Sequence, residues 1–461
     1  MSAALAVKPE SERSAPKPHF GLSGKTLLSA ACAVLLLAPL TFGAVEPWSI
    51  FALQTCAALL LVGWGVWQWS GGELKITPHP LHAPMLAFIG VVLVQDLAGI
   101  TTYRHVTNTS LILYLGYGML VFVVTQTLRR SSQIRPLAWV VCGYGAVVAF
   151  LALLQGIAPN GKIFWIWPVM HGSAIYGPYV NRNHYAGLME MLAPFPIVLA
   201  ASHFTQGNRK IAVAAIGGLM AGTIFLSGSR GGMLAFALQM VVLIVLLRRR
   251  ENNWKRPLIL GTFLAVMIGS LVWLGGNELT ERLASIHSEA QHEISGGVRL
   301  TIVRDSLRMW LAKPVLGWGL GTFPDVYPQF RSFYTTFFVN EAHNDYVQLL
   351  VETGLAGFGV AIWFVVLTFR GARPKLHDWT ETVNGTLTVA ALLGVVGILV
   401  HSFLDFNLQI PANAALFYVL CAIAASDGLH ESQRHWRRSR RHALILEPHS
   451  GPVEPVEPLV G

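Results

Sequence analysis

The residues best suited to chemistry are a histidine and three arginines in polar stretches between long apolar runs. His343 and Asn344 stand just before one such run, while Arg230, Arg299 and Arg304 lie in other polar stretches. A neutral histidine can accept a proton from a hydroxyl near neutral pH, so His343 is a candidate general base. Arginine stays charged and binds phosphate oxygens through two parallel N–H groups. This combination suits transfer of a group from an anionic leaving group to a hydroxyl.

Each feature also has a structural interpretation. A histidine at a membrane boundary is often an interfacial residue, and an arginine in a long loop is often ordinary surface charge. The run from Val180 to His184, which includes Asn183, is dense in hydrogen-bonding groups. The alternating glycines of Gly317–Gly321 either bring backbone N–H groups to an anion or form a tight turn. Both interpretations stay open at this point.

The sequence lacks the usual motifs for metal or nucleotide chemistry. It has no Asp-x-Asp, His-Glu-x-x-His or Cys-x-x-Cys. Gly24-Lys25-Thr26 ends like a P-loop, but His19 stands where that motif needs its first glycine, and a long apolar run follows. We therefore expect neither a metal nor a cofactor.

The composition is that of a membrane protein. Charged residues make up 12% of the 461 residues, against about 25% in soluble domains, and the mean hydropathy is +0.51. A bilayer core needs roughly 20 apolar residues per helix, and lipid offers backbone amides no partners. The sequence therefore predicts an all-α, polytopic membrane bundle of about twelve helices. The predicted spans are 26–45, 48–69, 84–100, 108–128, 136–157, 184–203, 211–227, 231–247, 257–276, 346–369, 385–404 and 407–426.

The distribution of Lys and Arg predicts the orientation. With both termini cytoplasmic, 23 of the 33 Lys and Arg residues fall on the inner side, as the positive-inside rule requires. The net charge of +9 then reflects topology and attraction to anionic membrane lipid, and does not indicate nucleic acid. The predicted divisions are an N-terminal tail at 1–24, helices one to nine at 25–276, a large outer loop at 277–345, helices ten to twelve at 346–426 and a C-terminal tail at 427–461.

The predicted outer side carries further polar features. An apolar stripe at helical spacing from Leu300 to Leu311 predicts an amphipathic helix in the large loop, which either lies on the membrane surface or caps the bundle. Four carboxylates fall near the predicted outer ends of spans. They indicate either an aqueous cavity open to the outside or buried hydrogen bonds that hold helices together. These carboxylates are Asp96, Glu190, Glu352 and Asp405.

The chain resembles a known family over roughly residues 180–410. His343-Asn344, nine further residues, Gly354, two residues and Gly357 resemble a pattern of bacterial O-antigen ligases and related oligosaccharyltransferases. The stretch from Arg299 to Gly357, with Ser229-Arg230-Gly231-Gly232 and Asn181-Arg182-Asn183-His184, resembles the core of the O-antigen ligase and polymerase superfamily.

The resemblance implies a multi-pass protein of the bacterial inner membrane with one large periplasmic loop. Family members take a glycan from an undecaprenyl diphosphate carrier. Ligases pass it to a lipid A–core sugar, and polymerases to another lipid-linked chain. The resemblance further implies that His343 activates the acceptor hydroxyl, and that Arg230 with Arg299 or Arg304 holds the diphosphate.

Supporting roles and alternatives stay open. Asn344 or a carboxylate such as Glu352 could orient the imidazole of His343, and Asn183 and His184 are candidate supporting residues. The ligase function is favoured by the histidine-to-glycine pattern, with a polymerase as its alternative. The alternative from another class is a twelve-span transporter. Internal repeats and helices broken at mid-membrane would indicate a transporter, and the sequence shows neither.

Overall fold

The protein is a bundle of helices with one very small sheet. A computed structural model describes residues 22–72, 74–129, 131–169, 175–250, 261, 296–335 and 338–426. The first group of elements is α1 (Gly24–Leu37), η1 (Ala38–Leu40), α2 (Pro47–Gly71), α3 (His82–Leu97), α4 (Arg104–Thr127), α5 (Ser131–Ile157), β1 (Lys162–Ile163) and β2 (Trp167–Pro168).

The second group begins with the segment that carries Asn183. It consists of α6 (Arg182–Leu192), α7 (Pro194–Ala201), α8 (Gly207–Leu226), α9 (Arg230–Arg250), α12 (Gly296–Ala312), α13 (Phe323–Val326), η4 (Tyr327–Gln329), α14 (Asp345–Ala372), η5 (Arg373–Leu376), α15 (Val383–His401), η6 (Asn407–Gln409) and α16 (Pro411–Ala425). β1 and β2 pair as a two-stranded antiparallel sheet.

The helices have the length and composition of membrane spans, which confirms the predicted class of fold. Among the described residues, eight segments are long and apolar enough to cross a membrane, namely α2, α4, α5, α6 with α7, α8, α9, α14 and α15. Three shorter apolar segments are α1 with η1, α3 and α16. The predicted span at 257–276 lies outside the described residues apart from Gly261, so the total of twelve stays a prediction.

The predicted tails and part of the predicted outer loop also lie outside the described residues. They are residues 1–21 and 427–461 of the two tails and residues 277–295 of the loop. The first predicted span, 26–45, is shorter in the structure: α1 ends at Leu37 and passes into the short helix η1, which contains Pro39. Proline cannot donate the next helical hydrogen bond, which explains the early end.

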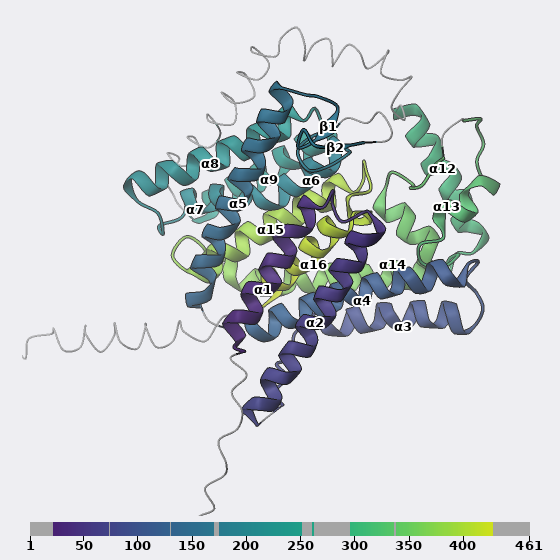
Figure 1. Ribbon diagram of the computed structural model, residues 1–461, viewed down its shortest axis with the longest axis horizontal. Helices are drawn as coiled ribbons and strands as arrows, with labels where there is room; N and C mark the ends of the chain where they lie inside the picture. Colours follow the sequence, from purple (N-terminus) through teal and green to yellow (C-terminus); the bar gives the residue numbers. More distant parts are fainter. Residues whose placement is uncertain are drawn as a thin grey trace, which may run out of the picture.

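Contacts between distant segments sort the helix ends into two groups. At one end, the N–H of Thr102 donates to the carbonyl of Trp318 (2.9 Å), and Asn344 Nδ2 donates to the carbonyl of Phe403 (3.0 Å). Figure 1 shows α12 and α13 at this end, beside the hairpin of α3 and α4. We call it the outer end, because the charge distribution predicts all of these segments on the outer side.

The opposite end joins the segments predicted on the inner side. The N–H of His203 donates to the carbonyl of Thr380 (3.1 Å), and Lys375 Nζ donates to the carbonyl of Ser426 (2.6 Å). The N–H of Thr77 donates to Gln126 Oε1 (2.8 Å). We call this the inner end. The orientation of the two ends in the membrane stays a prediction.

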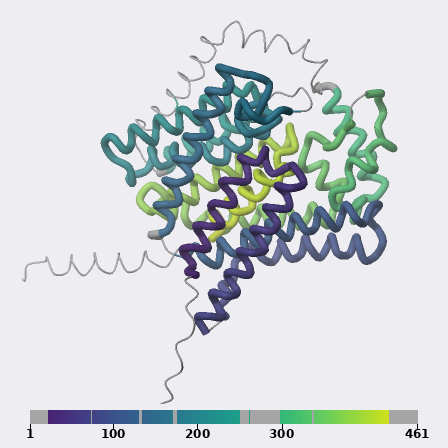
Figure 2. The backbone as a smooth tube through the Cα atoms, in the orientation of Figure 1, coloured from purple at the N-terminus to yellow at the C-terminus, as the bar shows by residue number. Residues whose placement is uncertain are grey.

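Two of the spans form the core of the bundle. In the most hydrophobic 18-residue stretch of each span, 83% of the residues are buried in α6–α7 and 72% in α15, but only 28% in α2. Figure 2 shows α15 and α16 running through the middle of the bundle, and nearly all residues of α16 are buried. The outer ends of α6 and α15 therefore carry their polar side chains on well-packed helices.

Helix α14 is broken near its outer end, and the break explains a glycine of the family pattern. Gly354 has φ +63° and ψ −166°, and the N–H groups of Leu355 and Ala356 donate to the carbonyls of Pro314 and Val315. A Cβ at Gly354 would lie 2.3 Å from the Val315 carbonyl oxygen. Only glycine tolerates both the left-handed conformation and this close approach.

The predicted amphipathic helix of the outer loop is present as α12, but its predicted apolar stripe is not the packed face. Leu300 and Leu311 are 71% and 66% exposed, whereas Ile302 and Met309 are fully buried. The helix therefore packs on the bundle through another face and leaves part of the predicted stripe uncovered by described residues. An exposed apolar stripe agrees with the membrane-surface alternative.

Candidate functional site

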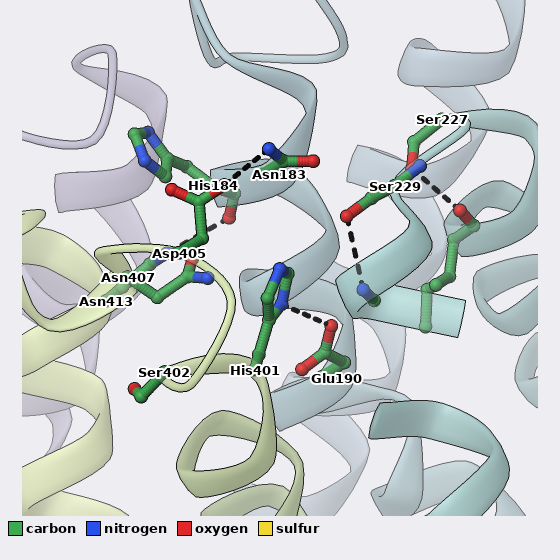
Figure 3. Close-up of polar contacts among 12 residues, drawn as sticks. Asn183, His184, Glu190, Ser227, Ser229, His401, Ser402, Asp405, Asn407 and Asn413 are labelled. Carbon is green, nitrogen blue, oxygen red and sulfur yellow. Dashed lines mark hydrogen bonds and ion pairs between the residues drawn. The ribbon is translucent and has the colours of Figure 1, made fainter. Parts of the chain in front are cut away.

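The buried carboxylate of Asp405 contacts three polar side chains at the outer end. Asp405 lies in the loop between α15 and η6 and its side chain is 1% exposed. Its Oδ1 lies 3.7 Å from Nδ1 of His343, and its Oδ2 lies 3.5 Å from Nη1 of Arg299. Oδ2 also accepts a hydrogen bond from Nδ2 of Asn183, as Figure 3 shows. We call His343, Asp405, Arg299 and Asn183 the outer cluster.

Helix caps hold the outer cluster in place. Asn344 is the N-cap of α14, and its Oδ1 accepts from the N–H groups of Tyr346 and Val347, so the predicted supporting role of Asn344 is that of a cap. His343 precedes the cap with φ +52°, a conformation that non-glycine residues rarely adopt and that often marks a functional constraint. Asn181 caps α6 in the same way and so fixes Asn183.

A second buried acid ties the loop of Asp405 to α14. Asp345 Oδ2 accepts from the hydroxyl of Ser402 (2.7 Å) and from the N–H of Leu408 (3.1 Å). The N–H of Asp345 donates to the carbonyl of Ser402 (3.0 Å). These hydrogen bonds fix the start of α14, next to His343, against the loop that carries Asp405.

The electrostatics of the outer cluster keep Asp405 ionised. Burial alone would raise the pKa of its carboxyl group, but the neighbouring His343 and the charge of Arg299 lower that pKa below its ordinary value. An ionised Asp405 facing Nδ1 favours the tautomer of His343 with its proton on Nδ1, which leaves Nε2 as a proton acceptor. The His343 side chain is 11% exposed. Its buried Nδ1 lies 3.7 Å from Asp405 Oδ1, which is an electrostatic contact rather than a hydrogen bond, and its Nε2 makes no hydrogen bond with a described residue.

The structure distinguishes the two candidate arginines of α12. Arg299 Nη1 donates to the carbonyl of Leu404 (3.0 Å) and pairs with Asp405, while its Nε is buried without a partner among the described residues. Arg304 is exposed on the same face as Leu300 and makes no hydrogen bond or ion pair with a described residue. Arg299 therefore belongs to the outer cluster and Arg304 does not contact it.

Arg230 begins α9 and lies beside a second buried pair. It is exposed and has no polar partner among the described residues. A Cβ at the next residue, Gly231, would lie 2.6 Å from the imidazole of His401. His401 Nδ1 lies 2.8 Å from Glu190 Oε1, and both side chains are fully buried (Figure 3). The small residues of this turn therefore allow α9 to begin in direct contact with α6 and α15.

His401 and Asp405 were not predicted as site residues. His401 falls within an apolar run, and Asp405 was predicted only as one of four carboxylates near span ends. His401 is linked to the outer cluster, because its carbonyl accepts from the N–H of Asp405 (3.1 Å). A histidine inside a span, close to an aspartate at its end, was the available signal.

Two histidines pack on one aromatic ring at the outer end. His184 and His343 meet Phe406 edge-on, with ring centroids 4.7 and 4.9 Å apart. His184 is 6% exposed, and its Nε2 has no hydrogen-bond partner among the described residues. His184 therefore supports the packing around His343 but makes no polar contact with it among the described residues.

Glu352 serves the glycine-rich turn rather than the imidazole. Its Oε2 accepts from the N–H of Gly321 (2.9 Å), and its carbonyl accepts from the N–H of Gly319 (3.0 Å). The N–H of Gly317 donates to the carbonyl of Lys313 (3.1 Å). These glycine N–H groups are thus used within the protein, which favours the tight turn over an anion site.

The other intramembrane carboxylates also have internal partners. Asp96 Oδ1 pairs with Nε of Arg104 at 2.9 Å and so joins the outer ends of α3 and α4. Together with the Glu190–His401 pair, this contact favours the interpretation that these carboxylates hold helices together. Across the described part of the chain, no group of three or more His, Cys, Asp or Glu side chains could hold a metal ion.

An apolar cavity of about 270 Å³ lies between α3, α4, α14 and α16. Phe88, Tyr114, Phe358 and Tyr418 contribute to its wall. Its lining also includes Asp345 and Tyr346, which directly follow His343 and Asn344 in the chain. The cavity therefore connects the apolar interior of the bundle with the start of α14.

Comparison with known proteins identifies the region that contains most of the candidate residues. Residues 215–362 match the family model described as O-Antigen ligase. This range includes Arg230, Arg299, Arg304 and His343, and it ends before Asp405. No curated protein sequence matches the chain. The family and the apolar helices together indicate a multi-pass bacterial membrane enzyme that transfers glycans. The match confirms the resemblance seen in the sequence, and over residues 215–362 the chain is similar to the O-antigen ligase family.

Proposed function

We propose that the protein transfers a glycan from undecaprenyl diphosphate to an acceptor hydroxyl at the periplasmic face of the inner membrane. The outer cluster is the observation that carries this proposal. It combines a proton acceptor, a carboxylate that orients it and an arginine with unused N–H groups at one end of a membrane bundle. A base and a cation side by side suit attack by a hydroxyl on a sugar whose leaving group is an anion.

The chemistry follows from the positions of these groups. Nε2 of His343 takes the proton of the acceptor hydroxyl while the oxygen attacks the anomeric carbon of the glycan. The bond from that carbon to the diphosphate oxygen breaks, and undecaprenyl diphosphate leaves with the bonding electrons. Asp405 holds Nδ1 and stabilises the imidazolium that forms.

The arginines provide charge for the leaving group. Arg299 keeps N–H groups beyond Nη1 for a phosphate oxygen, and Arg230 is an exposed cation at the start of α9. Arginine binds two phosphate oxygens at once and stays charged, so it can neutralise a departing diphosphate without a metal. We expect Arg299, rather than Arg304, to make this contact, since only Arg299 reaches the outer cluster.

The apolar cavity suits the lipid part of the carrier. Its wall is mostly aromatic and aliphatic, and it reaches Asp345 and Tyr346 at the start of α14. A polyprenyl chain in this cavity would place its diphosphate close to His343. The acceptor is a lipid A–core sugar for a ligase or the end of another lipid-linked glycan for a polymerase. The chemistry of the outer cluster serves both.

Reconstitution tests the proposal and separates the two acceptors. The purified protein in lipid nanodiscs is given an undecaprenyl diphosphate-linked oligosaccharide, with lipid A–core or with a second lipid-linked oligosaccharide, in EDTA. Mass spectrometry follows the products. We expect a joined glycan and free undecaprenyl diphosphate with one of the acceptors. Absence of transfer with both acceptors, or transfer only after a divalent ion is restored, would contradict the proposed mechanism.

A further inference from the structure

A second cavity, of about 280 Å³, lies at the inner end between α5, α7, α8 and α15. Its walls are formed largely by apolar side chains such as Phe195, Leu199 and Leu387, and two arginines, Arg135 and Arg209, also line it. It is remote from the outer cluster. Val383 at the start of α15 lines the cavity, whereas His401 ends that helix, and 19 residues at 1.5 Å each separate the two ends by about 28 Å.

The two arginines have no acidic partner among the described residues. Both are exposed, and Arg135 lies over the ring of Phe204 at 5.8 Å from its centroid. The acid closest in sequence to the start of α15, Glu381, pairs with His203 at 3.2 Å. Two cations beside an apolar cavity and without a carboxylate are suited to an anion that carries an apolar chain.

Helix geometry adds to the positive potential. α8 and α15 both begin at this cavity, so their N-terminal N–H groups lie near it, and helix N-termini favour anions. Gln206, the N-cap of α8, makes no side-chain hydrogen bond to the helix. The first N–H groups of α8 are therefore not satisfied by a side-chain cap.

We propose that this inner-end cavity binds an anionic phospholipid of the cytoplasmic leaflet. The phosphate lies between Arg135 and Arg209, and part of an acyl chain occupies the apolar cavity. A volume of about 280 Å³ corresponds to roughly nine water molecules at about 30 Å³ each, so it accommodates part of a lipid only. The rest of the chains extend over the exposed part of the cavity wall, where Trp139 is 42% exposed. This site is independent of the glycan chemistry.

Native mass spectrometry of the detergent-purified full chain tests the site. The probes are phosphatidylglycerol and phosphatidylcholine with identical acyl chains. The test variant is Arg135→Ala with Arg209→Ala, and the matched control is Arg370→Ala with Arg373→Ala. The control residues are two exposed arginines at the inner end that do not line the cavity.

We expect wild type and control to bind phosphatidylglycerol in preference to phosphatidylcholine. The test variant should lose about 10- to 30-fold in affinity, since each cation near an anionic lipid contributes about 1 kcal/mol. Arg135→Lys with Arg209→Lys keeps both charges, so it should retain the preference for phosphatidylglycerol. Arg135→Gln with Arg209→Gln also removes both charges and replaces the alanine variant if that variant does not fold. Equal binding of the two lipids by wild type, unchanged binding by the alanine variant, an equal loss in the control or loss of the preference in the lysine variant would overturn the proposal.

Discussion

Replacing Asp405 by asparagine removes one charge from the middle of the outer cluster while almost preserving its shape. The carboxylate faces Nδ1 of His343 at 3.7 Å and Nη1 of Arg299 at 3.5 Å, and its Oδ1 accepts from the N–H of Phe406 at 2.9 Å. Asparagine can keep an acceptor for one of these groups, but its amide N–H₂ must then face another donor. The imidazole of His343 loses its orienting carboxylate.

The substitution should change both the free energy of unfolding and kcat. A hydrogen bond to a charged group contributes about 1.5–3 kcal/mol, so Asp405→Asn should lower the free energy of unfolding by roughly that amount. A correctly placed general base contributes about 10²–10⁴-fold in rate, and loss of its orienting carboxylate should remove most of that factor from kcat. Because Asp405 does not line the apolar cavity, the KM for the lipid-linked donor should change much less.

The assay is steady-state transfer by the purified variant in nanodiscs, with thermal unfolding measured on the same sample. Asp305→Asn is the matched control. Asp305 is also fully buried, pairs with an arginine, Arg308, at 3.4 Å and accepts two hydrogen bonds from Ser332, but it lies outside the outer cluster. We expect the control to lose stability and to keep kcat. A near-wild-type kcat in folded Asp405→Asn, or the same loss in Asp305→Asn, would refute the orienting role.

Three further perturbations test other parts of the site and of the fold. Arg299→Ala should raise the donor KM and nearly abolish transfer, whereas Arg304→Ala should change little, because only Arg299 contacts Asp405; equal effects in a kinetic comparison would argue against this distinction. Gly354→Ala should lower the thermal unfolding temperature sharply or prevent folding, since its Cβ would lie 2.3 Å from the Val315 carbonyl oxygen at φ +63°; an unchanged melting curve would show that the break in α14 is not constrained. Burial, helped by Glu352 and Asp345, raises the pKa of Glu341 from 4.5 to about 8, so between these values the folded state holds one proton more than the unfolded state. Stability should therefore fall as pH rises from 4.5 to 8, by at most about 1.4 kcal/mol per pH unit, and Glu341→Gln should flatten the melting temperature measured against pH; an equally steep curve in the variant would contradict this assignment.

The sequence predicts the class of fold because membrane spans depend on local composition. The apolar runs and the distribution of Lys and Arg identify helices and group their ends without any tertiary information. The spacing from His343 to Gly354 is also local, since it measures the first turns of α14 up to its break. Proline and glycine effects on individual helices, such as the early end of α1, change bounds but not the class of fold.

The outer cluster could not be predicted in full, because its members meet only through packing. Asn183 and Asp405 are 222 residues apart in the chain, and nothing in either local sequence indicates the contact. The choice between Arg299 and Arg304 depends on which face of α12 packs on the bundle, and the apolar stripe indicated a face that is partly exposed. Buried polar groups such as Asp305 and Ser306 on the packed face explain why hydrophobicity alone was a poor guide.

The most direct test of the central claim is a single-turnover measurement on His343→Ala that separates donor binding from transfer. The purified variant and wild type are loaded with radiolabelled undecaprenyl diphosphate-linked glycan in nanodiscs, and acceptor is then added. We expect His343→Ala to bind the donor as wild type does, because Arg299 and the apolar cavity are intact, and its transfer rate to fall by about 10²–10⁴-fold. A wild-type rate of transfer in His343→Ala would contradict the assignment of His343 as the base at this site.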